Sequence, residues 1–147
     1  MLIREIMTIY PVRVEITSTM RRAAEIISLA EASDLMVIDD ERNFVGVLSE
    51  GDILRAVLPN FDEILAAGGS LADAFDFFAR KGQELSGRPI APLVIRNAIV
   101  VKPEDEAAMA ASVMVEKQIR RLPVVDGGKL VGTVSRADIC RALIYGL

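Results

Sequence analysis

The sequence predicts an α+β fold in which two β-α-β-β-α repeats pack as a pseudo-twofold module, with a helical insert between them. One stretch occurs twice: GVLSEGDILRAVL at residues 46–58 and GTVSRADICRALI at residues 132–144 are identical at six of thirteen positions. A constant offset extends the match, since LMVID at residues 35–39 is followed 87 residues later by LPVVD. An internal period of this kind indicates one structural unit that is present twice.

The chain therefore divides into a first repeat at 1–58, an insert at 59–88 and a second repeat at 89–147. In each repeat, alternating β-branched residues predict a first strand, at 11–16 and at 98–101. Polar residues at 17–19 and 103–106 then predict capped, apolar-periodic helices. In the first repeat we expect helices at 20–30 and 51–58 and strands at 35–39 and 44–49. In the second repeat we expect helices at 107–117 and 137–146 and strands at 122–126 and 130–135.

The insert belongs to neither repeat. It contains two helical stretches, at 61–68 and 70–85, which flank a break at Gly68-Gly69. Four of the five phenylalanines lie in it: Phe61, Phe75, Phe77 and Phe78. These rings either cover the two-lobe core or a dimer seam, or they form a docking surface for another protein. The sequence leaves both interpretations open.

Composition excludes several partners. The net charge of -4 provides no general attraction to nucleic acid or to an anionic membrane. The N-terminal residues 1–7 include two charged side chains and no signal-peptide run, and no stretch approaches the roughly 20 apolar residues that span a bilayer. The single cysteine, Cys140, permits no internal disulfide. We expect a cytoplasmic protein with no nucleic-acid partner and no membrane insertion.

Enzymatic function is not expected either. The sequence contains no histidine, which excludes Ser-His-Asp and Cys-His catalysis and histidine-based zinc sites. Neither GxxxxGK[ST] nor GxGxxG is present. We predict no catalytic residues, no metal site and no obligatory cofactor.

The order and repetition of two short motifs identify a family. RRLPVVD at residues 120–126 precedes G-h-h-S-x-x-D, where h is apolar or Thr, and the second motif starts at both Gly46 and Gly132. This pattern resembles the cystathionine-β-synthase (CBS) domain family over about residues 2–58 and 89–146. The resemblance implies a stand-alone CBS pair with two clefts that bind adenosine-containing ligands such as AMP, ADP, ATP or S-adenosylmethionine. It also implies a regulatory role and pairing of modules into dimers.

The repeated Ser-x-x-Asp has two interpretations. Structurally, Ser49 and Ser135 can cap the first N–H groups of a helix, while Asp52 and Asp138 suit the helix dipole. Functionally, a carboxylate can accept from both hydroxyls of a ribose diol, and the serine with nearby N–H groups can contact the ribose-phosphate side. The family uses the aspartate in this second way. Ribose binding is predicted slightly more strongly for Asp138 than for Asp52.

By resemblance, residues near the first strand of each repeat would line an apolar adenine slot. These residues are Thr8 and Val12, or Ile95 and Ile99, and plain core packing explains them about as well.

Phosphate recognition should differ between the repeats. The second repeat contains Arg120, Arg121 and Arg136, and arginine suits phosphate through its forked donors, although each arginine can equally be a solvated surface residue. The corresponding residues of the first repeat are Ser33, also a candidate contact, then Asp34 and Glu50. The two acidic side chains disfavour polyphosphates. The family resemblance implies that the phosphates of both clefts approach the centre of the module, so Arg120 and Arg121 can serve a ligand whose ribose lies on Asp52, on Asp138 or on either. We expect one strong and one weak or empty site, and a ligand with few negative charges.

Two functions fit these observations. The first is a regulatory module that binds an adenosine ligand in the cleft between the repeats and signals to a regulated partner protein, with the chain as a homodimer. The alternative is a ligand-free dimeric scaffold whose aromatic insert contacts other proteins. Detectable ligand binding distinguishes the two.

Overall fold

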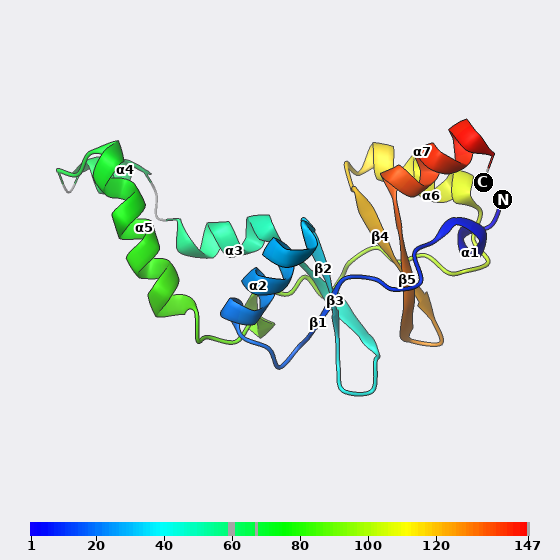
Figure 1. The fold of residues 1–147 in the computed structure, drawn as a ribbon, viewed down its shortest axis with the longest axis horizontal. Coiled ribbons are helices and arrows are strands. Elements are labelled where there is room, and N and C mark those ends of the chain that lie inside the picture. The colour runs from blue at the N-terminus through cyan, green and yellow to red at the C-terminus, as the bar shows by residue number, and fades with distance from the viewer. Residues whose placement is uncertain (59–60, 67, 147) are drawn as a thin grey trace.

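The computed structural model describes residues 1–58, 61–66 and 68–146, and these form two lobes side by side along the long axis of the molecule (Figure 1). The first lobe contains β1 (Arg13–Glu15), α2 (Met20–Ala30), β2 (Asp34–Ile38), β3 (Phe44–Ser49) and α3 (Glu50–Val57). The second lobe contains α6 (Ala107–Glu116), β4 (Arg121–Asp126), β5 (Lys129–Ser135) and α7 (Arg136–Tyr145). The remaining helical segments are α1 (Ile3–Ile6), α4 (Phe61–Ala66), α5 (Leu71–Leu85) and the 3₁₀ helix η1 (Ala91–Leu93). The arrangement confirms the α+β class and the pairing of two repeats.

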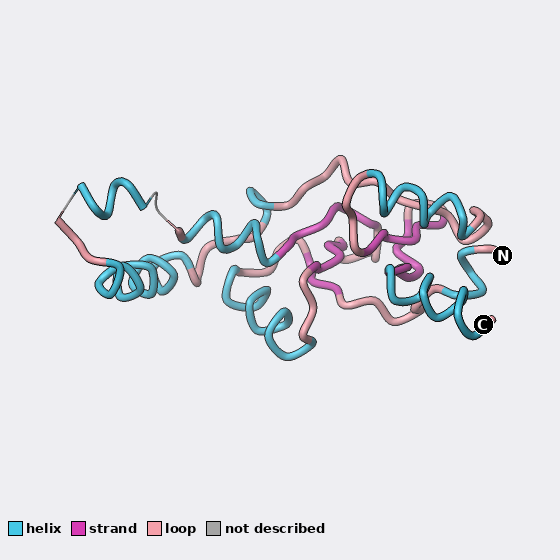
Figure 2. Tube along the Cα trace, turned by 90° about the horizontal axis from the view of Figure 1, so that it is seen from above, coloured by secondary structure: helices cyan, strands magenta, loops and turns pink. Residues whose placement is uncertain are grey.

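The strands of both lobes meet in the middle of the molecule, with helices around them (Figure 2). In the first lobe β1 runs parallel to β2, and β2 is antiparallel to β3. In the second lobe β4 and β5 form an antiparallel pair. The register places Asp34 opposite Ser49 and Arg121 opposite Ser135, so the end of each hairpin from which a helix departs also carries a charged residue.

The strand predicted at 98–101 is reduced to one parallel bridge between Val101 and Val124 in the described chain. The chain turns directly after this bridge, because the Lys102 N–H donates to the Asp105 carboxylate at 2.7 Å instead of extending a ladder. Pro103 follows and has no N–H to contribute.

The two long central helices begin in different ways. Thr19 caps α2 with its side chain, as expected. The cap predicted at 103–106 for α6 is wrong, since the N-cap residue Glu106 makes no side-chain capping bond. The Ala107 N–H donates instead to the Met1 carbonyl oxygen at 2.8 Å, so the N-terminal segment satisfies the first turn of α6.

Each lobe is completed by a segment from the start of the other repeat. Ile3 and Ile6 of α1 are buried in the core of the second lobe. Ile90 and Val94, on either side of η1, are buried in the core of the first lobe. Burial of these side chains stabilises the contact between the lobes by about 1.5–3 kcal/mol for each one fully buried. The two lobes therefore share one structure and are not independent units.

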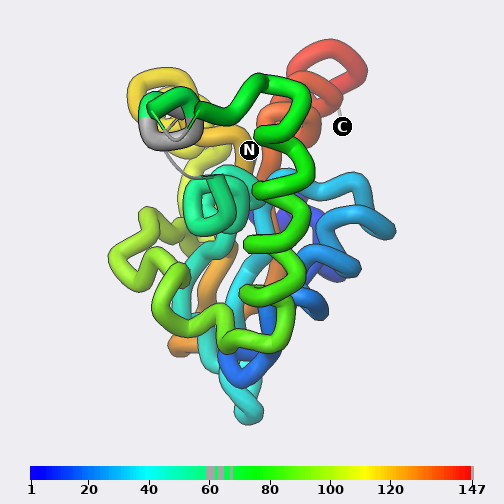
Figure 3. Tube along the Cα trace, turned by 90° about the vertical axis from the view of Figure 1, so that its left-hand side faces the viewer, coloured from blue at the N-terminus to red at the C-terminus, as the bar shows by residue number. Residues whose placement is uncertain are grey.

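The insert projects from the outer end of the first lobe, where α5 lies alongside α3 (Figure 3). Gly68 has φ +80°, and Ser70 caps α5, so the break falls where the sequence predicts it. Phe75 is 74% exposed and Phe77 is 49% exposed, so these rings do not cover the core. The side chain of Phe61 lies outside the described residues. No helix in the described ranges is both long and apolar enough to cross a bilayer.

Candidate functional site

A cleft of about 510 Å³ lies between the two lobes, where α3 leaves β3 and where β4 begins. Its lining combines the start of β2, the end of β3 and the first turn of α3 with the segment at 95–99 and with residues 118–123. The predicted site residues that line it are Ser33, Ser49, Asp52, Ile95, Ile99, Arg120 and Arg121. Residues far apart in the sequence therefore meet at one site, around the aspartate of the first repeat.

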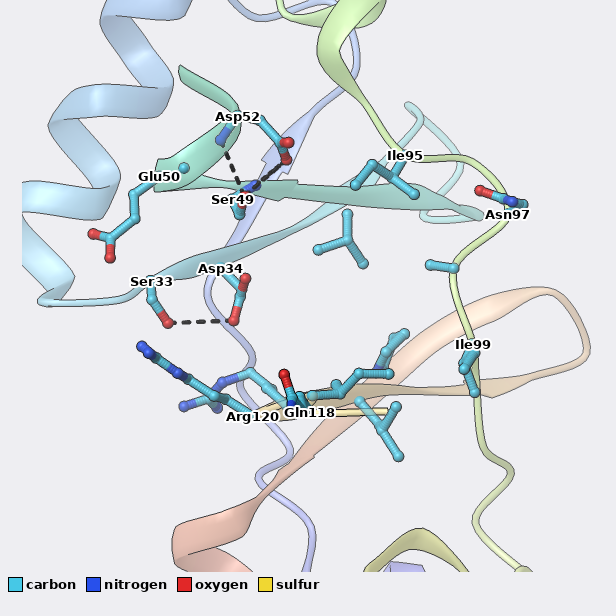
Figure 4. Close-up of a pocket in the computed structure, with 17 residues that line it drawn as sticks. Ser33, Asp34, Ser49, Glu50, Asp52, Ile95, Asn97, Ile99, Gln118 and Arg120 are labelled. Carbon is cyan, nitrogen blue, oxygen red and sulfur yellow. Dashed lines mark hydrogen bonds between the residues drawn. The ribbon is translucent and has the colours of Figure 1, made fainter. Parts of the chain in front are cut away.

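Figure 4 shows how the polar side chains are distributed across the cleft. Ser49 and Asp52 lie on one side, Gln118 and Arg120 lie on the opposite side, and Asp34 lies between them. Apolar Ile95 and Ile99 come from the segment at 95–99, and both side chains are partly exposed, with 46% and 40% exposure.

The backbone of this wall explains the glycine of the repeated motif. Val47 and Ile95 exchange two backbone hydrogen bonds, of 3.0 and 2.9 Å. A Cβ on Gly46 would lie 2.4 Å from the Ile95 carbonyl oxygen, so the two segments can approach this closely only with glycine. The second repeat has the same design, in which a Cβ on Gly132 would lie 2.7 Å from the Thr8 carbonyl oxygen.

Ser49 and Asp52 form a reciprocal capping box at the start of α3. The Asp52 N–H donates to Ser49 Oγ at 3.2 Å, while the Ser49 N–H and hydroxyl donate to Asp52 Oδ2 at 3.0 and 2.8 Å. The structural interpretation of Ser-x-x-Asp is therefore correct. The other oxygen, Oδ1, accepts from Arg55 Nη2 at 2.7 Å. Oδ1 therefore has no capping role.

The charge of Asp52 is maintained by these bonds. Burial alone would raise the pKa of Asp52, but the hydrogen bonds from Ser49 and Arg55 outweigh it and hold the pKa below its ordinary value of 3.8. The carboxylate is therefore ionised at neutral pH, which makes it a hydrogen-bond acceptor for hydroxyl groups.

Both signs of charge line the cleft. Asp34, Glu50 and Asp52 are acidic, and Arg120 and Arg121 are basic. Arg121 Nη1 donates to Thr133 Oγ1 at 3.2 Å, whereas the described residues give the Arg120 guanidinium no hydrogen bond or ion pair. Arg120 is therefore available to bind an anionic group.

The remaining predicted residues lie elsewhere. Ser135 and Asp138 form the same capping box in α7 but are buried, with 7% and 4% exposure. Arg136 donates to the carbonyl oxygens of Met114 and Ile119, both at 2.9 Å, so its guanidinium contacts the C-terminal end of α6.

Thr8 and Val12 also lie outside the cleft around Asp52. Thr8 pairs with Thr133 through two backbone hydrogen bonds, of 2.8 and 2.9 Å. Val12 packs against the core of the first lobe, in agreement with its structural interpretation.

A third Ser-x-x-Asp box occurs in the insert. Ser70 Oγ donates to Asp73 Oδ2 at 2.8 Å and accepts from the Asp73 N–H at 3.2 Å, in an exposed position at the start of α5. The geometry of the box alone therefore does not mark a ligand site. Its surroundings must supply the specificity.

Sequence reasoning missed eight lining residues: Val47, Gly51, Asn97, Ala98, Gln118, Ile119, Leu122 and Pro123. Arg96 and Asn97 form a turn between the Ile95 bridge and Ile99, so strand alternation gives no signal for Asn97. Gly51 and Gln118 gave no signal either.

Comparisons with known proteins agree with this architecture. The family model of the CBS domain matches the chain twice, at residues 3–59 and 88–145. Protein MJ1426 of Methanocaldococcus jannaschii is 29% identical over 119 residues, which cover 74% of this chain and 71% of MJ1426. The chloroplastic CBS domain-containing protein CBSX2 of Arabidopsis thaliana is 29% identical over 128 residues, or 83% of this chain and 54% of CBSX2.

Two crystal structures of CBSX2 resemble the fold at 26% sequence identity. One has a TM-score of 0.80 and covers 98% of this chain and 94% of that chain. The other is a complex with AMP, has a TM-score of 0.75, and covers 98% of this chain and 96% of that chain.

Proposed function

The chain belongs to the CBS domain family, and from this premise we propose that it is a non-catalytic regulatory module that binds an adenosine-containing ligand in the cleft around Asp52. Binding between the lobes would change their relative geometry, and a partner protein would detect this change. A ligand shifts such an equilibrium only through its different affinities for the two states.

The single observation that carries the proposal is the position of Asp52 Oδ1. It is a carboxylate oxygen without a capping role, in a cleft that also contains apolar side chains and an arginine, Arg120, that has no partner among the described residues. A ribose diol on Asp52, an adenine ring on Ile95 and Ile99, and a phosphate near Arg120 use all three features. CBSX2, which shares 26% of its residues with this chain, was crystallised with AMP.

Charge favours a ligand with few phosphates. Asp34 and Glu50 line the same cleft, and each additional phosphate charge would interact unfavourably with them. We therefore propose AMP or S-adenosylmethionine ahead of ADP and ATP. One cleft would bind strongly, and the buried Asp138 would not take part in it.

Thermal unfolding tests the proposal. The purified protein is heated with AMP, ADP, ATP, S-adenosylmethionine and a GMP control. A ligand at 100 times its Kd stabilises the folded state by about 2.7 kcal/mol, and we expect this for AMP. The Asp52→Ala variant should lose the response, because the ribose acceptor is gone. No shift with any adenosine compound would contradict the proposal.

The insert provides a matched control. Asp73→Ala removes the aspartate of an equivalent capping box that has no place in the cleft. This variant should keep the full response to AMP although it loses a comparable helix cap. Loss of the AMP response in both variants would show that Asp52→Ala acts through the cap and not through ribose.

The assembly is part of the same proposal. The exposed Phe75 and Phe77 of α5 support a protein contact, either within a homodimer or with the regulated partner. They also favour the second candidate function, a ligand-free scaffold. Sedimentation with and without AMP separates the two functions, because only the sensor has an assembly that responds to the nucleotide.

A further inference from the structure

The last turn of α3 carries an arginine, Arg55, whose side chain reaches back to the first turn of the helix. Arg55 Nη2 lies 2.7 Å from Asp52 Oδ1, the carboxylate oxygen that the capping box leaves free. The same guanidinium lies over Gly51, since a Cβ on Gly51 would be 3.2 Å from Arg55 Nη1 and 3.5 Å from Nη2. Gly51 lines the cleft, so the guanidinium covers the backbone at its edge.

The second repeat forms the same ion pair with an alanine in place of the glycine, and its arginine lies differently. The equivalent residues are Ala137, Asp138 and Arg141, so a methyl group occupies the place over which Arg55 folds. Arg141 Nη2 lies farther from its aspartate, at 3.3 Å from Asp138 Oδ1, and also donates to the Ile6 carbonyl oxygen at 3.2 Å. Arg141 therefore links α7 to α1. For Arg55 no second partner is found within the described residues.

We propose that Arg55 is a gate residue: it occupies Asp52 Oδ1 in the ligand-free protein, and an adenosine ligand must displace it to bind its ribose there. This inference rests on the proposed function and adds its regulation. The Arg55 side chain is 73% exposed and the Asp52 side chain 13%, so the arginine can swing into solvent while the carboxylate stays in place. Gly51 leaves room for the guanidinium to lie close over the backbone in this position.

The cost of opening the gate sets the effect on affinity. An exposed ion pair contributes about 0.2–1 kcal/mol, and opening the gate gives up this energy. Removal of the arginine should therefore tighten binding by about two- to fivefold. Gly51→Ala should have a smaller effect in the same direction, because a methyl group 3.2 Å from Nη1 shifts the guanidinium only slightly while Arg55 itself remains.

Calorimetric titration with adenosine tests the gate, because adenosine has the ribose and base but no phosphate. Wild type, Arg55→Ala, Gly51→Ala and Arg141→Ala are compared at low salt. We expect tighter binding by Arg55→Ala and Gly51→Ala and unchanged binding by Arg141→Ala. In 0.5 M NaCl the wild type should approach the affinity of Arg55→Ala, since salt screens the exposed pair.

The alternative outcomes are distinct. Unchanged or weaker adenosine binding by Arg55→Ala overturns the gate while the proposed function stands. Weaker AMP binding together with unchanged adenosine binding would make Arg55 a phosphate contact, which also overturns the gate. If neither wild type nor Arg55→Ala binds adenosine or AMP, the proposed function fails and the gate fails with it.

Discussion

The helix starts of the two repeats contain the same three residue types at the same spacing and lie in different surroundings. Ser49 and Asp52 line the cleft between the lobes, and Arg55 forms an ion pair with Asp52. Their counterparts form the same capping box, but the Asp138 side chain is only 6% exposed and Arg141 is tied to the backbone of α1. The motif thus forms the same local structure twice, and only one copy presents a carboxylate at the described cleft.

The difference arises from the neighbours of the motif. Glu50 and Gly51 in the first repeat correspond to Arg136 and Ala137 in the second. Arg136 reaches across to the carbonyl oxygens at the end of α6, which joins α7 to that helix. Glu50 makes no such contact among the described residues and lines the cleft instead. The start of α7 is therefore tied to a neighbouring helix, while the start of α3 lines the cleft.

The largest effect should follow from substitution of the two motif glycines, which tests whether both repeats need the same close approach. In Gly46→Ala the new Cβ would lie 2.4 Å from a carbonyl oxygen of the neighbouring segment, and in Gly132→Ala 2.7 Å. Since backbone must move in both, we expect a loss of about 1–3 kcal/mol in the free energy of unfolding, greater for Gly46→Ala. Urea denaturation measures it. Equal stability of wild type and both variants would contradict the close approach.

The next effect concerns the two aspartates. Asp138→Ala should cost more stability than Asp52→Ala, whereas Asp52→Ala should cost more AMP binding. Asp138→Ala leaves buried Ser135 groups without a partner and should cost about 1–3 kcal/mol. Asp52→Ala removes a more accessible cap and should cost about 1 kcal/mol. Urea denaturation without ligand and AMP titration of both variants give the two rankings. Loss of AMP binding in Asp138→Ala, with binding kept in Asp52→Ala, would reverse our assignment of the site.

Much of the fold could be predicted because local patterns determine it. The α2 helix and β3 occupy the predicted ranges, since their periodicity and caps act over a few residues. The exchange of α1 and η1 between lobes could not be predicted, because the partner of Ile3 lies about a hundred residues away in sequence. The strand predicted at 98–101 fails for a local reason. Its residues alternate as in a strand, but the turn at Lys102 ends the pairing.

The sequence predicted many of the residues that line the cleft, but it did not predict which of them lie together. The repeats gave Asp52 and Asp138 equal motifs, and the number of nearby arginines favoured Asp138. In the structure Arg120 and Arg121 of the second repeat line the cleft beside Asp52 of the first. This crossing depends on how the lobes pack, which no local pattern encodes. Both repeats have an arginine at this position, so nothing in the sequence indicated that the Arg55 guanidinium lies close to Gly51.

A smaller effect should appear in the pH dependence of stability, and it tests the environment of Asp52 at the start of α3. Because the pKa of Asp52 is lower in the folded chain than its ordinary value of 3.8, its ionised form favours folding. This stability is fully present above the ordinary pKa and is lost as the pH falls through the folded pKa. Wild type should exceed Asp52→Asn by a constant margin above about pH 5, and the margin should shrink below about pH 4. Urea denaturation across pH 3–7 measures it, and a constant margin down to pH 3 would contradict the shift.

The smallest effect concerns Glu50, the position at which the two helix starts differ in charge. Glu50→Gln keeps the shape of the side chain and removes one negative charge from the lining. A residual repulsion of about 0.5 kcal/mol for a polyphosphate corresponds to a roughly twofold change in Kd. We expect tighter binding of ATP, less change for AMP and none for adenosine, measured by calorimetric titration. Glu41→Gln, on the turn between β2 and β3, serves as the control that removes the same charge far from the cleft. An equal gain for adenosine would show that the substitution acts through cleft shape, because a neutral ligand cannot report the removal of a charge.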